Sequence, residues 1–142
     1  MKDYPKRIKK LLREYLIEAY ERELHRELTV LEGSFEEWRQ GKISSGELSY
    51  RIHQYEVGPS RELYKKYNED SLAEMMVAYA IVAGILRRDE IPQELLEALE
   101  RPLSFYESLE AEGRLKNLSD QEGLKKQLVF QRKCPRIFGF DR

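Results

Sequence analysis

Tyrosine, arginine, histidine and glutamate side chains gather between residues 50 and 67, on both sides of a Gly58-Pro59 pair. This stretch holds four of the nine tyrosines and one of the two histidines in the chain. An imidazole titrates near neutral pH, and a guanidinium group binds anions through paired hydrogen bonds. We therefore predict a binding site, for a protein or a small anionic ligand, that is formed by Tyr50, Arg51, His53, Glu56, Arg61 and Tyr64.

The same stretch also has a purely structural interpretation. Buried tyrosine and histidine side chains often stabilise helix packing by forming hydrogen bonds with their neighbours. Gly58-Pro59 is expected to break the helix and to form a corner, because proline cannot donate a backbone hydrogen bond. Such a corner would bring His53, Glu56, Arg61 and Tyr64 close together. The pattern leaves both interpretations open and assigns no catalytic residue.

A second set of side chains indicates a different chemistry. Carboxylates recur at helical spacing near the start of the chain and again around residue 70, at Glu14, Glu18, Glu21, Glu69, Asp70 and Glu74. Two acidic helix faces can hold Mg²⁺ through oxygen ligands and activate a water molecule for attack on a phosphate. Lysine and arginine are interleaved with these carboxylates, a pattern that is also typical of a solvated face. The alternative function is thus a Mg²⁺-dependent hydrolase of a nucleotide or another phosphate ester.

The elements that must position these residues are helices. Apolar residues recur at spacings of three and four from Pro5 to Leu31, which predicts a long amphipathic first helix with a break near Gly33. Residues 75–86 contain no charge, and they predict a buried central helix over about residues 71–88. The expected fold is an all-α helical bundle around that central helix.

Serine residues followed three positions later by glutamate mark where helices begin. In such a capping box the hydroxyl and the carboxylate each accept a hydrogen bond from a free backbone amide at the helix start. The pattern occurs at Ser34, where it supports the predicted break near Gly33, and again at Ser44, Ser71 and Ser119. It predicts helices that begin at the last three positions.

Charge divides the chain of 142 residues into two parts. Residues 1–112 carry 17 Lys and Arg against 23 Asp and Glu, whereas residues 113–142 carry 8 against 3. We predict a helical domain over residues 1–112, followed by a basic, loosely docked C-terminal extension over residues 113–142 with one short helix. The acidic body and the basic extension attract each other or an anionic partner.

Composition excludes several classes of protein. The single cysteine, Cys134, and two distant histidines cannot supply a zinc site, and no Gly-rich phosphate loop is present, so we predict no metal and no cofactor. No apolar run reaches the roughly 18–20 residues that span a bilayer, and the start of the chain does not resemble a signal peptide. We therefore expect a cytoplasmic protein without a membrane partner. A pI near 6.2 argues against a nucleic-acid partner.

The first helix carries a gradient of charge. Basic residues occupy its start at Lys6, Arg7, Lys9, Lys10 and Arg13, and acidic residues follow at Glu18, Glu21, Glu23, Glu27 and Glu32. Two copies in an antiparallel arrangement would set basic ends against acidic stretches, although another helix of the same chain could also compensate the charge. The favoured prediction is a small cytoplasmic helical module that works by binding and self-associates as a homodimer.

Overall fold

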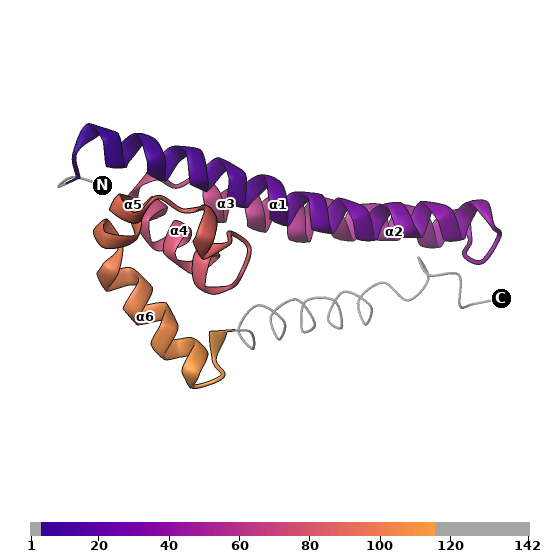
Figure 1. Cartoon of the computed structure of the whole chain (residues 1–142). Coiled ribbons are helices and arrows are strands. Elements are labelled where there is room, and N and C mark those ends of the chain that lie inside the picture. The colour runs from indigo at the N-terminus through magenta and orange to yellow at the C-terminus, as the bar shows by residue number, and fades with distance from the viewer. Residues whose placement is uncertain (1–3, 116–142) are drawn as a thin grey trace.

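The computed structural model describes residues 4–115, and all regular secondary structure within them is helical (Figure 1). The predicted all-α fold is confirmed. The helices are α1 (Lys6–Arg39), α2 (Ser45–Tyr55), α3 (Arg61–Tyr67), α4 (Ala73–Val82), α5 (Gln93–Ala98) and α6 (Glu100–Ala111). Three short turns accompany them: η1 (Glu56–Ser60), η2 (Asp70–Leu72) and η3 (Arg88–Glu90). Most of the predicted extension over residues 113–142, with its helix from Ser119, lies outside the described residues.

The first helix is longer than the apolar pattern predicted. α1 has 34 residues, which is about 50 Å at 1.5 Å per residue, and it continues through Gly33 without the expected break. Ser34 is buried, and its hydroxyl accepts a hydrogen bond from Arg51 Nη1 of α2 at 3.2 Å. This contact with α2 outweighs the local cost of a glycine inside a helix, which is about 1 kcal/mol. None of the described helices is long and apolar enough to cross a bilayer.

The C-terminal half of α1 and the antiparallel α2 form a two-helix arm (Figure 1). The chain reverses at Gly41, whose φ of 75° lies in the left-handed region that glycine tolerates. Ser44 caps α2 as predicted, because its hydroxyl accepts a hydrogen bond from the Glu47 amide at 3.0 Å. At the tip of the arm, Trp38 Nε1 donates to the Ser45 hydroxyl at 3.1 Å.

α2 and α3 form one continuous helical run, so the predicted break at Gly58-Pro59 is wrong. Pro59 has no amide proton for the carbonyl of Tyr55, and its ring crowds the preceding turn. The backbone accommodates the proline by widening into the π-helical turn η1. The residues before and after the proline therefore follow one another along the same helical run instead of meeting at a corner.

The predicted central helix exists, but it is shorter than residues 71–88. Ser71 lies in the turn η2 and does not cap α4. α4 ends in a Schellman motif, in which Gly84 has a φ of 81° and the Ile85 amide donates to the Ala80 carbonyl at 2.9 Å. The helix packs against α1 and α6. Its residues that are buried in the core are Ala73, Val77, Ala78, Ala80 and Ile81.

The hydrophobic core lies between the first half of α1 and the helices α3, α4, α5 and α6. Its largest fully buried side chains are Leu12, Val77, Leu86, Leu95 and Leu99. α1 contributes to this core only as far as Leu24. The arm therefore extends beyond the core, as Figure 1 shows.

A charge placed at Ala80 tests this account of the core. Ala80 is fully buried, so the Ala80→Glu variant leaves an unpaired charge in the interior and should lose several kcal/mol of stability or fail to fold. Ala111→Glu, at the exposed last residue of α6, is the matched control and should change the free energy of unfolding in urea melts by less than about 0.5 kcal/mol. A soluble Ala80→Glu protein of unchanged stability would contradict the assignment of α4 as the core helix.

Candidate binding site

The six residues of the predicted site do not gather in one place, because they are spread along the continuous run from α2 to α3. Tyr50 is buried, whereas His53 is exposed on α2. Tyr64 is exposed on α3. Arg51 belongs to the junction of α1 and α2, and Glu56 and Arg61 lie at the π-helical turn.

Arg51 joins the two helices of the arm. Its Nη1 donates to Glu37 Oε2 of α1 at 2.9 Å, and its Nε donates to Glu47 Oε1 of α2 at 3.0 Å. Burial alone would lower the pKa of Arg51, but the hydrogen bonds to these two carboxylates raise it overall. Because the donors of Arg51 are directed into this junction, the geometry favours the structural interpretation of this residue.

Glu56 and Arg61 form an ion pair across the π-helical turn, with Arg61 Nη2 and Glu56 Oε2 at 3.2 Å. Residues five apart face different directions in an α-helix, but the wider π turn brings them into line. Both side chains are more than half exposed. Exposed ion pairs contribute only about 0–1 kcal/mol, so this pair holds Arg61 weakly.

A small pocket opens between α1 and the start of α3. It has a volume of about 240 Å³ and is lined by Tyr20, Ser60, Arg61, Tyr64 and Lys65. Arg61 and Tyr64 belong to the predicted site, whereas the other three residues were missed. Ser60 and Lys65 lie within residues 50–67, which contain the predicted site, whereas Tyr20 reaches the pocket only through the packing of α1 against α3.

Ser34 of α1 and Arg51 of α2 are hydrogen-bonded across the junction of the arm. Apolar residues lie three positions before and one position after each of these two residues. They form two strips, Leu31 and Phe35 on α1, and Leu48 and Ile52 on α2. An antiparallel helix pair has an approximate two-fold axis perpendicular to its plane. Equivalent positions therefore lie on the same side of the arm, and the two strips form one surface.

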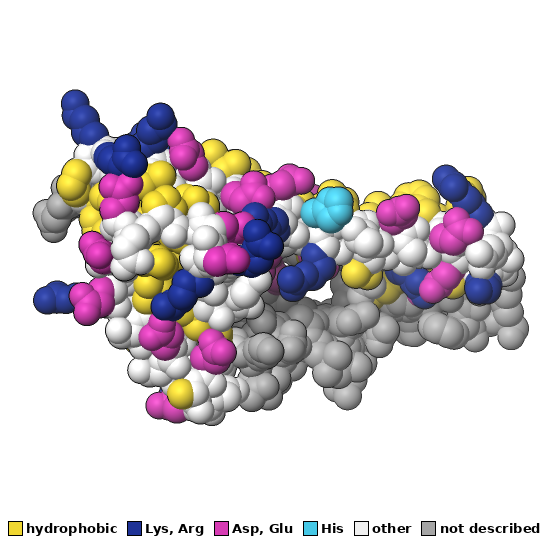
Figure 2. All heavy atoms as spheres, in the orientation of Figure 1, with side chains coloured by type: hydrophobic (Ala, Val, Ile, Leu, Met, Phe, Trp, Pro, Cys, Tyr) yellow, Lys and Arg dark blue, Asp and Glu magenta, His cyan; other side chains and the backbone are white. Residues whose placement is uncertain are grey.

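This surface, which we call the apolar face, continues along α1 towards the core. Helical spacing places Ile17, Tyr20, Leu24 and Leu28 on the same strip as Leu31 and Phe35. Tyr64 of α3 lines the same pocket as Tyr20 and extends the apolar face there. Four large side chains of the face are well exposed: Ile17 by 68%, Leu28 by 44%, Ile52 by 39% and Tyr64 by 61%. Figure 2 shows hydrophobic side chains at several places along the edge formed by α1. The pocket shares Tyr20 and Tyr64 with this face.

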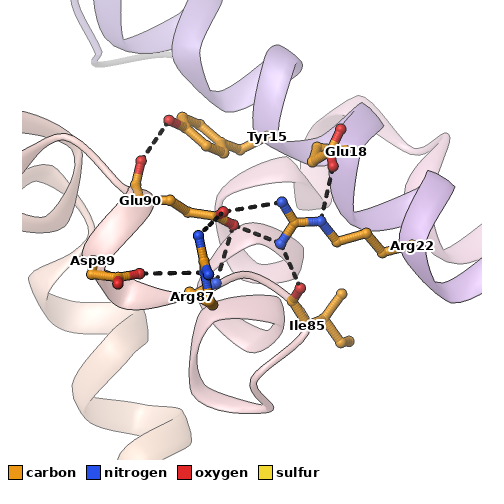
Figure 3. Close-up of polar contacts among 7 residues, drawn as sticks. All are labelled: Tyr15, Glu18, Arg22, Ile85, Arg87, Asp89 and Glu90. Atoms are coloured by element: carbon orange, nitrogen blue, oxygen red, sulfur yellow. Dashed lines mark hydrogen bonds and ion pairs between the residues drawn. The ribbon is translucent and has the colours of Figure 1, made fainter.

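A dense polar cluster attaches α1 to the segment between α4 and α5 (Figure 3). Arg22 forms a bidentate ion pair with Glu90, in which Nη1 donates to Oε1 at 2.6 Å and Nη2 donates to Oε2 at 3.0 Å. Its Nε donates to Glu18 at 2.8 Å, and Nη1 also donates to the Ile85 carbonyl at 2.9 Å. Arg22 above all holds the pKa of Glu90 below its usual range, while Glu90 raises that of Arg22. The mutual pairing of these groups indicates a structural role.

A second charged cluster lies where α1, α3 and α4 meet. Lys66 Nζ donates to Glu23 Oε2 at 3.2 Å and lies 4.1 Å from the centre of the Tyr79 ring. Beside them, burial and then the carboxylate of Glu23 raise the pKa of Tyr67. A cation that faces both an aromatic ring and a carboxylate is well accommodated at a half-buried position, so this cluster also stabilises the packing.

The side chain of Asp70, one of the six carboxylates considered for Mg²⁺, lies outside the described part of the structure, and the other five form no metal site. Glu18 pairs with Arg22, and Glu74 accepts a hydrogen bond from the Tyr4 hydroxyl at 2.6 Å. Within residues 4–115, no group of three or more His, Cys, Asp or Glu side chains is arranged to hold a metal ion. The alternative hydrolase function stays a prediction.

Comparison with known proteins found no match to this chain among family models, curated proteins or solved structures.

The ion pair of Arg22 and Glu90 predicts a pH-dependent contribution to stability. The folded-state pKa of Glu90 is lowered, so its contribution is present above the unfolded value of about 4.3 and disappears as the pH falls through the folded value. Glu90→Gln should cost about 1–3 kcal/mol at pH 7, and the difference should shrink between pH 5 and pH 3 in urea melts. Glu112→Gln, in an exposed pair with Arg114, is the control and should have little effect. A difference that does not depend on pH would contradict this account.

The two arginines of the predicted site should differ in their effect on folding. Arg51→Ala removes the shared partner of Ser34, Glu37 and Glu47, so it should lower the free energy of unfolding by about 1–3 kcal/mol. Arg61→Ala removes only an exposed ion pair and should change it by less than about 1 kcal/mol. Denaturant melts of both variants provide the measurement. Equal losses of stability would refute the assignment of Arg51 to structure and of Arg61 to a free surface.

Proposed function

We propose that this protein is a small helical module that works by binding and assembles as a homodimer through its apolar face. The observation that carries the proposal is the exposure of Ile17, Leu28, Ile52 and Tyr64 along one surface. Continuous apolar surface of this kind marks interaction sites in proteins. A cytoplasmic location is part of the proposal.

The shape of the arm supports a helical partner. Two antiparallel helices with an apolar strip on each present the geometry that two further helices complete in a four-helix arrangement. A second arm of the same protein supplies both helices at once. In a two-fold dimer both copies use the same face, so one binding event buries each exposed apolar residue in both subunits.

Charge supports a second copy as the partner. The first turn of α1 contains no acidic residue and no side-chain cap, so its lysines and arginines oppose the helix dipole. Arg7 pairs with Glu94, but Lys6 and Arg13 form no ion pair among the described residues. Figure 2 shows basic side chains at this end of the molecule. An antiparallel α1 of a second copy brings the acidic stretch beyond Glu18 towards these cations.

The homodimer is tested by measuring mass with and without a charge on the apolar face. Light scattering at micromolar concentration should give about twice the monomer mass for the wild type. Leu28→Glu should give the monomer mass with unchanged helical circular dichroism, because the charge would be buried without a partner in the dimer. Val30→Glu is the matched control: Val30 is 67% exposed on the other side of the arm junction, and the variant should stay dimeric. A monomeric wild type would refute the proposal.

A further inference from the structure

The pocket beside the apolar face is too small for most whole ligands. Pockets for small molecules usually enclose about 300–1,000 Å³, whereas this one has about 240 Å³, roughly the room of eight water molecules. Such a volume suits one side chain of a docked protein. Because the pocket shares Tyr20 and Tyr64 with the apolar face, a partner that covers the face also covers the pocket.

Most of the surface that lines the pocket is apolar, but its two charged residues are both cations, which favours a negatively charged group there. Arg61 and Lys65 bring two positive charges, and Glu56 offsets only one of them. Lys65 is exposed and forms no ion pair among the described residues. The remaining lining residues, Tyr20, Ser60 and Tyr64, all carry hydroxyl groups, which can donate hydrogen bonds to a carboxylate.

α1 itself supplies carboxylates of this kind. Glu21 and Glu32 are exposed and form no ion pair among the described residues, in contrast to Glu18 and Glu23. They are eleven residues apart, which is close to three helical turns, so they share one strip of α1. Each follows an exposed residue of the apolar face by four positions, Ile17 in one case and Leu28 in the other. We call this strip the acidic edge.

We infer that each pocket receives a carboxylate from the acidic edge of the other copy, so that Arg61 and Lys65 pair with Glu21 or Glu32 of the partner subunit. The inference rests on the proposed homodimer and names the polar contacts between its subunits. Pairing through Glu21 and pairing through Glu32 correspond to two registers about 16 Å apart along α1, and the residue found in the cross-link below distinguishes them. Arg61 exchanges its exposed pair with Glu56 for a contact that the dimer shields from water, where charge-assisted hydrogen bonds are stronger.

Two complementary variants test the contact between subunits. One variant carries Arg61→Glu and Lys65→Glu, and the other carries Glu21→Lys and Glu32→Lys. Each variant alone sets like charges together at both pockets, so its dimer dissociation constant should rise at least tenfold. When the two are mixed, opposite charges meet at both pockets, and a heterodimer should form with an affinity within a few fold of that of the wild type. Sedimentation of the separate and mixed proteins measures these constants.

The control is Arg101→Glu, an exposed change on α6 that alters charge by the same amount as Lys65→Glu and should leave the dimer constant unchanged. Carbodiimide cross-linking of mixed ¹⁴N- and ¹⁵N-labelled wild-type protein should join Lys65 to Glu21 or Glu32 in peptides that combine both labels. A wild-type dimer that is insensitive to these charges and lacks the cross-link would overturn the pocket contact alone. A wild-type monomer would overturn the homodimer and the contact together.

Discussion

The length of α1 is the constraint on which the rest of the structure depends. At about 50 Å, this helix is longer than the core that α4, α5 and α6 build against its first half. An isolated amphipathic helix gains most of its stability from packing, so the second half needs a partner. Within the described residues, α2 and the start of α3 provide that partner. Two helices cover only one flank of each other, so Leu28 and Ile52 beside their junction remain exposed, whereas Leu48 is buried.

The polar clusters divide into those that are complete within the chain and those that are not. Arg22 with Glu90, Arg51 with Glu37 and Glu47, and Lys66 with Glu23 each join separate elements of the fold. Their side chains are at least half withdrawn from solvent. The charges beside the apolar face differ, because the pair of Arg61 and Glu56 is exposed and Lys65 has no ion pair in the described part of the chain. Charges with weak or no ion pairs therefore lie beside the exposed apolar side chains, as they also do at the start of α1.

Local patterns in the sequence predicted the helices well but predicted their ends and joints poorly. The all-α fold, the Ser44 cap and the buried segment around Ala80 followed from spacing and capping alone. The joints depended on tertiary contacts. Gly33 stays within α1 because Ser34 packs against α2, and Pro59 stays within a helical run because one wider turn absorbs it. The local sequence is the same for a proline that a π-helical turn accommodates and for a proline that ends a helix. The predicted corner, and the site that depended on it, were therefore wrong.

The π-helical turn connects this misprediction with the candidate pocket. A break at Gly58-Pro59 would have turned α3 away from the line of α2, whereas the wider turn continues the helical run along α1. The extra residue in the turn also rotates α3 relative to α2, which aligns Glu56 with Arg61 and sets Arg61 and Tyr64 beside Tyr20. π-turns are rare, occur mostly as single turns inside α-helices and are frequent at functional sites. Here the proline requires the wider turn, and the altered direction brings the cation of Arg61 and the ring of Tyr64 to the pocket beside Tyr20.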